Sequence, residues 1–208
     1  MNEKDNLKNF YIFRHGECPF NLSGHIQGQR FNNSLTPAGL LQAAKIGAYL
    51  SDKKIEVIIT SPLRRAIQSA KIVRRSVEVP ILVDKRFIEV NMGIIEGMHI
   101  SAAEKKFPEV YRHWRSTAPE DAATRFEEGE TKAEVRKRIF EALNYYARQT
   151  SYRNIAVSGH GITISQILLY FNILRSNIPN GSILHLTYLN GEWHYDGLIL
   201  PDKPKPAK

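Results

Sequence analysis

Short apolar runs recur along the chain and alternate with segments of helical periodicity, except that residues 84–130 are expected to hold loops and short helices. The runs lie at residues 10–13, 55–60, 79–84 and 154–158. Uninterrupted apolar strands of this length are typical of a parallel sheet whose two faces are both buried, whereas a half-exposed strand alternates apolar and polar residues. The pattern therefore predicts four buried strands, of which the one at 79–84 has the weakest signal.

Two of the expected helices begin at a polar residue followed by proline. Thr36 is expected to cap a helix that starts at Pro37, and Ser61 a helix that starts at Pro62. A Ser or Thr side chain can accept a hydrogen bond from a free N–H of the first turn, and proline suits the first position because it has no N–H. Further helices are expected at 131–150 and 162–173.

The segment 182–200 is predicted to form a β-hairpin, with Asn190 and Gly191 as its turn. Strands that alternate with helices indicate an α/β fold, a three-layer sandwich whose mostly parallel central sheet carries helices on both faces. We expect one domain over residues 1–208, with polar tails at about 1–8 and 201–208. The Pro- and Lys-rich C-terminal tail is expected to be disordered.

The charge balance favours an anionic partner. The chain has 29 basic and 21 acidic residues, a net charge of +8, but no long basic tract, so a small phosphorylated substrate is favoured over nucleic acid. No apolar stretch is long enough to span a membrane, and the polar N-terminus lacks the apolar core of a secretory signal. The single cysteine, Cys18, excludes an internal disulfide and favours the reducing cytoplasm. The sequence does not fix the oligomeric state, and a homodimer is compatible with it.

Basic side chains follow three of the predicted strands. The carboxyl ends of parallel strands meet at one edge of a sheet, where ligands bind, so these side chains are expected to converge. The helix that begins near Gly161 adds free backbone N–H groups, which favour an anion. Two arginines and two histidines around one point suit a dianion such as a phosphoryl group. The residues are Arg14, His15, one of Arg64 and Arg65, and His160.

Six motifs occur in an order that resembles the histidine phosphatase superfamily, with its phosphoglycerate mutase-like fold. They are "RHGECPFNLSGHIQG", "LTPAG", "SPLRRAIQSA", "FIEVNMGIIEG", "GETKAEVRKR" and "SGHG". The resemblance extends from about residue 10 to the final hairpin, and each motif lies near a predicted junction between strand and helix. It is nearest to the bacterial phosphatase branch of the superfamily.

The resemblance implies a role for individual residues. His15 resembles the nucleophile that carries a phosphohistidine, and Glu89 matches the proton donor. Arg65 is favoured over Arg64 because it precedes Ala66, and helical neighbours point about 100° apart, so only one can face the site. The expected phosphate pocket consists of Arg14, Asn21, Gln27, Gly28, Arg65, His160 and Gly161.

The implied activity is that of a metal-independent phosphomonoesterase without a cofactor, in which arginines stabilise charge in place of a metal ion. The runner-up is a phosphoglycerate mutase, which is disfavoured by the compact segment between Glu89 and His160 and by the lack of an adjacent arginine pair there. A third hypothesis, a phosphate-binding regulatory pseudoenzyme, is disfavoured because the expected catalytic residues are intact.

Other chemistries fit the sequence less well. Cys18 could be a thiol phosphatase nucleophile, but those enzymes need an arginine six positions later, where this chain has Gly24. No HExxH or CxxC pattern indicates a metal site. The family usually has Thr or Ser at the position of Cys18. A thiol forms weaker hydrogen bonds than a hydroxyl, so the pocket is expected to be less polar at this point than in the family.

Overall fold

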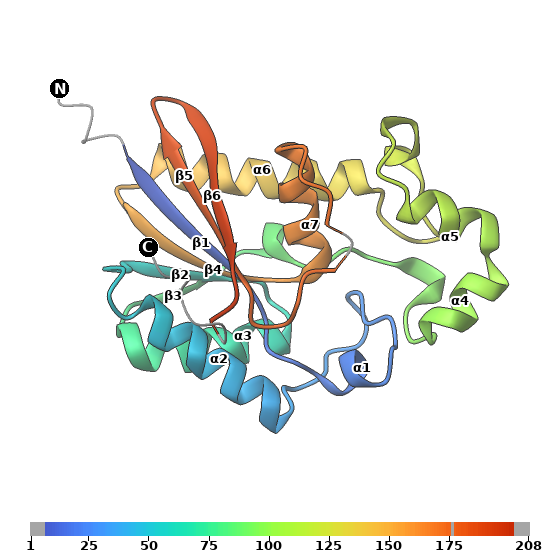
Figure 1. Ribbon diagram of the computed structural model, residues 1–208, viewed down its shortest axis with the longest axis horizontal. Coiled ribbons are helices and arrows are strands. Elements are labelled where there is room, and N and C mark those ends of the chain that lie inside the picture. The colour runs from blue at the N-terminus through green and yellow to red at the C-terminus, as the bar shows by residue number, and fades with distance from the viewer. Residues whose placement is uncertain (1–6, 176, 202–208) are drawn as a thin grey trace.

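The central feature of the fold is a six-stranded mixed sheet (Figure 1). The computed structural model describes residues 7–175 and 177–201. The strand order is β3-β2-β4-β1-β5-β6; the first four strands are parallel, and β5 and β6 are antiparallel. This confirms the predicted α/β fold with a mostly parallel sheet. The strands are β1 (Lys8–Arg14), β2 (Val57–Thr60), β3 (Ile81–Val83), β4 (Asn154–Gly159), β5 (Ile183–Leu189) and β6 (Glu192–Ile199).

The predicted tails fall almost wholly outside the described residues. Residues 1–6 and 202–208 are not described, so the expectation of a disordered C-terminal tail lies outside them. At the other end, Lys8 already belongs to β1 and pairs with Tyr188 of β5. The N-terminal tail is therefore shorter than predicted, because backbone pairing with the hairpin extends the first strand beyond its apolar part.

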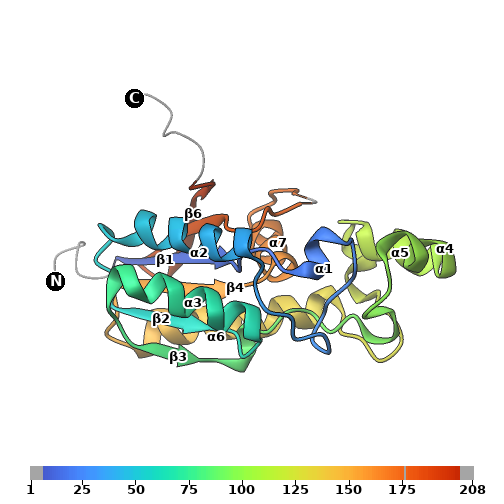
Figure 2. The same ribbon diagram turned by 90° about the horizontal axis from the view of Figure 1, so that it is seen from below.

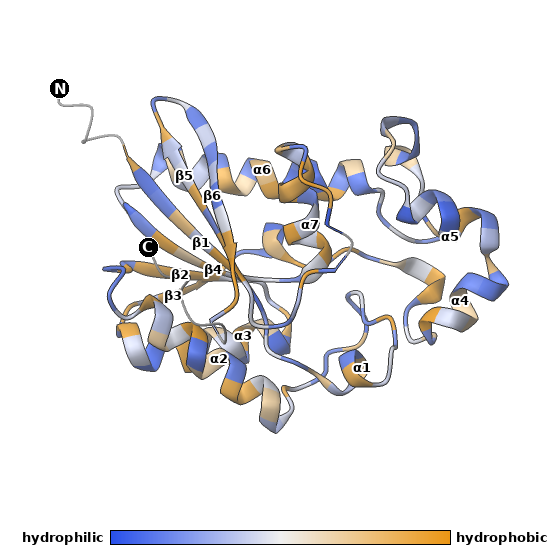
Figure 3. Ribbon diagram, viewed as in Figure 1, coloured by the Kyte–Doolittle hydropathy of each residue, from blue (hydrophilic) through white to orange (hydrophobic). Residues whose placement is uncertain are grey.

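Helices cover both faces of the sheet, as predicted (Figures 1 and 2). The helices α2 (Pro37–Leu50) and α3 (Arg64–Val77) pack on one face. The helices α6 (Lys132–Gln149) and α7 (Gly161–Tyr170) pack on the other. Side chains of β1 alternate between the two cores, with Phe10 and Ile12 toward α6 and α7, and Tyr11 and Phe13 toward α2 and α3. Hence the middle of β1 is apolar on both faces, whereas its ends and the strands β5 and β6 also carry hydrophilic residues, as Figure 3 shows.

The observed helix ends and the hairpin turn can be compared with those predicted from the sequence. Thr36 caps α2, and its side chain accepts a hydrogen bond from the N–H of Gly39. The hairpin turn is also confirmed: Asn190 and Gly191 have φ of 52° and 92°, the left-handed pair that a tight turn between two strands requires. Helix α7 ends at Tyr170, earlier than predicted, since Asn172 is left-handed with φ of 58°.

The predicted start of the helix after β2 is wrong. Helix α3 begins at Arg64, with Leu63 rather than Ser61 at the N-cap position. The Ser61 hydroxyl lies in a turn before the helix, where it accepts a hydrogen bond from the N–H of Leu63 and contacts Nε2 of His160 at 2.7 Å. A long-range contact therefore takes the side chain that local preference assigns to capping.

Short helices form a third group beyond the carboxyl ends of the parallel strands, at the right of Figure 1. Among the residues that the structure describes, no helix is both long enough and apolar enough to cross a bilayer. The group consists of α1 (Pro19–Leu22), η3 (Gly93–Ile95), α4 (Ile100–Lys106), α5 (Pro108–Arg115) and η4 (Pro119–Ala123), whereas the short helix η2 (Lys85–Phe87) packs against α6.

Candidate active site

His15 lies directly after β1 and is held in one tautomer. Its side chain is almost fully buried, with 2% exposure. Nδ1 lies 2.6 Å from the carbonyl oxygen of Gly16, which can only accept, so Nδ1 carries the proton and donates it. Nε2 therefore has the free lone pair, and it accepts a hydrogen bond from Nε of Arg65 at 3.2 Å. This arrangement presents one unprotonated ring nitrogen to the pocket.

Arg65 is the arginine of the adjacent pair that faces the site, as predicted. It is 1% exposed, whereas Arg64 is exposed to solvent. Besides its contact with His15, the Arg65 guanidinium donates to the carbonyl oxygens of Gly28 at 2.8 Å and Phe31 at 3.2 Å. These bonds orient the guanidinium plane beside Nε2 of His15.

Arg14 and His160 complete the basic cluster and bring unpartnered polar atoms to it. The rings of His15 and His160 are 5.2 Å apart between centroids. Nε of Arg14 and Nδ1 of His160 are buried, and neither has a hydrogen-bond partner within the described part of the chain. Buried polar groups are normally paired, so two unpaired nitrogens in the cluster that surrounds the unprotonated Nε2 of His15 favour a polar ligand.

Burial keeps both histidines neutral. Desolvation lowers the pKa of His15 well below its usual 6.5, and the nearby charges of Arg65 and Arg14 lower it further. The pKa of His160 is lowered in the same way, first by desolvation and then by Arg65. A neutral imidazole has a lone pair for attack on phosphorus, and here it stays neutral at a pH where a free histidine would be protonated.

Glu89 occupies the helix terminus that the sequence analysis assigned to the ligand. Its carboxylate accepts hydrogen bonds from the N–H groups of Ile162 at 3.2 Å and Thr163 at 3.3 Å, in the first turn of α7, and of Val90 at 3.0 Å. Two of the N–H groups that were expected to favour a bound anion are therefore occupied by a carboxylate of the protein itself. Gly161 still lines the pocket, where a Cβ atom would lie only 3.3 Å from the Arg14 guanidinium.

The loop residues implied by the resemblance also reach the cavity. Asn21 accepts a hydrogen bond from the N–H of Cys18 at 2.9 Å, and the buried Gln27 has an unpartnered amide oxygen. Gly28 has φ of 51°, and a Cβ atom there would lie 1.8 Å from Oε1 of Glu96. All three residues line the cavity that contains His15.

Cys18 is buried beside His15 without taking part in the basic cluster. Its Sγ lies 3.9 Å from Nδ1 of His15, on the side of the ring turned away from the lone pair at Nε2. Desolvation raises the pKa of the thiol to about 11, so it stays protonated near neutral pH. A protonated thiol is a poor nucleophile, which agrees with the rejection of a thiol phosphatase.

These residues surround one cavity of about 420 Å³. Its inner end contains Arg14, His15, Arg65 and Glu89, and its outer wall includes Tyr111 and Trp114 of α5. Within residues 7–175 and 177–201, no group of three or more His, Cys, Asp or Glu side chains is placed to hold a metal ion. The cavity can hold a phosphoryl group at its inner end and a small organic group at its mouth.

Comparison with known proteins agrees with this geometry. The sequence model of the histidine phosphatase superfamily (branch 1) matches residues 10–199. The chain belongs to the histidine phosphatase superfamily. This histidine phosphatase is thereby classed with the phosphoric monoester hydrolases, in agreement with relatives that are named phosphatases.

The relatives carry the names of both phosphatases and mutases. "Putative phosphoserine phosphatase 2" of Hydrogenobacter thermophilus is 29% identical over 89% of this chain and 92% of its own. "Probable phosphoglycerate mutase GpmB" of Proteus mirabilis is 28% identical over 91% of this chain and 89% of its own. The solved structure of a mycobacterial glucosyl-3-phosphoglycerate phosphatase, at 22% identity, matches with a TM-score of 0.78 over 91% of this chain and 97% of its own. That structural match shows the shared fold.

A contact network that the sequence analysis missed holds the Glu89 segment of this histidine phosphatase. Arg138 of α6 binds both carboxylate oxygens of Glu130, at 2.9 and 3.0 Å. The same guanidinium donates to the carbonyl oxygens of Arg86, Ile88 and Glu89 at 2.8, 2.6 and 3.1 Å. The backbone that carries Glu89 is thus tied to α6.

Two buried or half-buried carboxylates stabilise the neighbouring loops. Glu130 also accepts a hydrogen bond from the N–H of Asn91 at 2.8 Å, and Glu96 accepts from the N–H groups of Gln29, Arg30 and Met92. The sequence did contain a signal for the residues that the analysis missed, because they lie within the motifs that carry the family resemblance. "SPLRRAIQSA" contains Ser61, "FIEVNMGIIEG" contains Glu96, and "GETKAEVRKR" contains Glu130 and Arg138.

Proposed function

We propose that this protein is a metal-independent phosphomonoesterase that hydrolyses small phosphorylated metabolites through a phosphohistidine on His15. The observation that carries the proposal is the fixed tautomer of His15, which turns an unprotonated Nε2 toward the cavity and toward Arg65. A nucleophile that needs no base, next to buried cations, suits covalent capture of a phosphoryl group.

In the first step, Nε2 of His15 attacks phosphorus, and the bond between phosphorus and the ester oxygen breaks. Glu89 gives its proton to the leaving oxygen, and the N–H groups of Ile162 and Thr163 stabilise the carboxylate that remains. In the second step, water attacks the phosphohistidine while Glu89 accepts a proton from it. Inorganic phosphate is released, and His15 and Glu89 return to their starting forms.

Charge on the phosphoryl oxygens is stabilised by the side chains of the cluster. Arg65 and Arg14 remain cationic despite their burial, because guanidinium does not lose its proton in proteins. Nε of Arg14 is a buried donor without a protein partner, and Nδ1 of His160 is a second one when the Ser61 hydroxyl donates to Nε2; phosphoryl oxygens would provide the missing acceptors. Donors that are already in place when charge develops lower the barrier most effectively.

Hydrolysis is expected to be faster than phosphoryl transfer between the positions of a phosphoglycerate, which is the second candidate because some relatives are named mutases. Purified protein should release phosphate from a panel of phosphomonoesters at rates that excess EDTA does not change, since arginines stabilise the charge. Much faster interconversion of 2- and 3-phosphoglycerate than hydrolysis of either would favour the mutase. Loss of activity in EDTA that Mg²⁺ or Zn²⁺ restores would contradict metal independence.

Arg138 is expected to act as a positioning residue for Glu89. Replacing Arg138 by Met removes its bonds to three carbonyl oxygens of the Glu89 segment, and a displacement of about 1 Å can cost up to about 10²-fold in rate. We expect Arg138→Met to lower kcat for an alkyl phosphate by about 10- to 100-fold, with a smaller loss for p-nitrophenyl phosphate, whose leaving group needs no proton.

The exposed neighbour Lys137 on the same helix provides the control. Lys137→Met should leave both rates unchanged. Equal losses on the two substrates in Arg138→Met would show a general effect on folding or binding instead of a displaced proton donor.

A further inference from the structure

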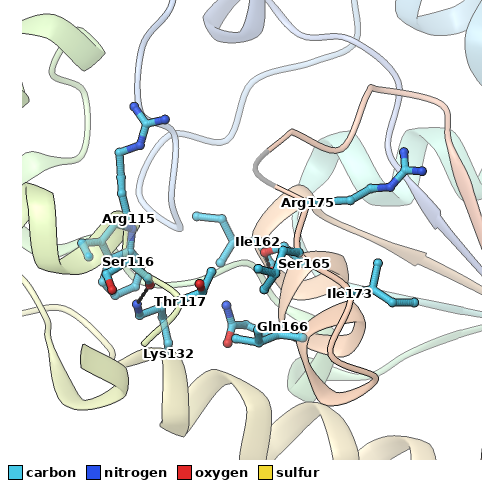
Figure 4. A pocket seen from close by; sticks show the side chains of 12 residues that line it. Arg115, Ser116, Thr117, Lys132, Ile162, Ser165, Gln166, Ile173 and Arg175 are labelled. Atoms are coloured by element: carbon cyan, nitrogen blue, oxygen red, sulfur yellow. Dashed lines mark hydrogen bonds between the residues drawn. The ribbon is translucent and has the colours of Figure 1, made fainter. Parts of the chain in front are cut away.

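A second cavity adjoins the catalytic one. It has a volume of about 340 Å³ and lies between α5, the start of α6 and α7 (Figure 4). Trp114, Arg115, Ile162 and Ser165 line both cavities, so the two adjoin at these side chains. An organic group that leaves the mouth of the catalytic cavity along α7 enters this second space.

The second cavity is cationic. Its lining includes Arg115, Lys132 and Arg175, and no Asp or Glu belongs to the described residues that form it. Arg115 and Lys132 lie on one side of the cavity and Arg175 on the other, with α7 between them (Figure 4). The side chains of Arg115 and Arg175 are exposed and can turn toward a bound group.

Lys132 contributes a buried charge that no carboxylate of the described residues pairs with directly; Asp121 acts on it only through its electrostatic field. It is 5% exposed, and its ammonium group donates to the carbonyl oxygens of Ser116 at 2.5 Å and His113 at 3.4 Å, which are both neutral. An ammonium group has three donors, and a buried charge is costly unless an opposite charge pairs with it. An anion in the cavity would supply that pairing.

The rest of the lining, between the catalytic cavity and the cations, suits the uncharged middle part of an elongated ligand. Ile162, Leu169 and Ile173 provide apolar surface, and Ser165 and Gln166 provide hydrogen-bonding groups between the catalytic cavity and the cations. A ligand that fills both cavities therefore has a phosphoryl group at one end, a partly apolar middle and an anionic group at the other end.

We propose that the second cavity binds an anionic group, carboxylate or phosphate, at the far end of the leaving group, and so selects elongated phosphomonoesters with two anionic ends. The proposal rests on the proposed function for the position of the scissile phosphoryl group. It makes Arg115 and Arg175 specificity-determining residues, which contact the leaving group without touching the reacting atoms.

Binding can be tested apart from turnover. In the non-nucleophilic variant His15→Ala, calorimetry would compare ω-phosphonooxyalkanoates of increasing chain length with their methyl esters, which lack the second charge. Above a threshold length we expect the acid to bind about tenfold more tightly than its ester, the effect of one charge-assisted contact. Introducing Arg115→Gln together with Arg175→Gln should remove the difference, while Arg112→Gln, on the outer face of α5 and paired with Glu109, should keep it.

Equal affinities of acid and ester at every chain length would overturn the proposal, as would an equal loss in the Arg112→Gln control. Hydrolysis of p-nitrophenyl phosphate by the wild-type protein tests the proposed function separately. If that reaction fails while the acid still binds more tightly than its ester, the anion site stands and the phosphatase assignment does not. If the reaction proceeds without the difference in affinity, the phosphatase assignment stands alone.

Discussion

Replacing His15 by alanine is expected to remove turnover, with kcat lower by more than about a hundredfold on every phosphomonoester, because loss of a covalent nucleophile costs several kcal/mol of transition-state stabilisation. No neighbouring group can take its place. Nδ1 of His160 belongs to a ring whose Nε2 contacts Ser61, and the thiol of Cys18 is held protonated by burial. The remaining cations would still bind the substrate, so KM should change much less than kcat.

The decisive measurement is the covalent intermediate itself. Wild-type protein quenched during turnover of a ³²P-labelled substrate should carry acid-labile radioactivity on His15, and His15→Ala should carry none. The exposed His194 on β6 serves as the control, since His194→Ala should keep both the label and the rate. Retention of more than about a hundredth of the wild-type kcat in His15→Ala would contradict a nucleophilic role.

Replacing Glu89 by glutamine is expected to cost about 10²- to 10⁴-fold on alkyl phosphates, the usual contribution of a general acid. The loss on p-nitrophenyl phosphate should be much smaller. An alkyl ester leaves as a strongly basic alkoxide, which needs the proton, whereas p-nitrophenolate leaves readily without it. The Ile162 N–H donates to Oε2 of Glu89 and the Thr163 N–H to Oε1, so the single amide oxygen of Gln can keep only one of these two contacts.

Single-turnover rates give the clearest comparison, because slow attack by water on the phosphohistidine could hide the difference at steady state. Glu120→Gln, an exposed carboxylate in η4, is the matched control and should leave both substrates unaffected. Equal losses on the two substrates in Glu89→Gln would show that Glu89 orients the site or activates water without acting as the donor.

The features that the sequence predicted well are those set by neighbours in the chain. The cap at Thr36 and the turn at Asn190 and Gly191 follow from local backbone chemistry, and the apolar runs define the buried strands. Parallel strands end at one edge, so the convergence of the basic residues followed from topology. The choice of Arg65 over Arg64 came from the family resemblance, and the angle between helical neighbours required only that one of the two face the site.

What could not be predicted depends on contacts between distant segments. Ser61 was assigned to a helix cap, but His160, far along the chain, engages its hydroxyl. The N-terminus of α7 was assigned to the ligand, yet Glu89 reaches it from another loop. Side chains of this kind have more than one reasonable partner, and only the folded arrangement decides between them.

The division of the pocket between two parts of the fold has a consequence for how such proteins diversify. The groups proposed to perform the chemistry stand at the ends of β1, β2 and β4 and in loops tied to them, whereas the outer wall comes from α4 and α5. Insertions or substitutions at 98–125 can therefore reshape the opening while the catalytic geometry is left in place. The range of accepted substrates can thus evolve through this one segment, under a selection separate from that on the groups proposed to perform the chemistry.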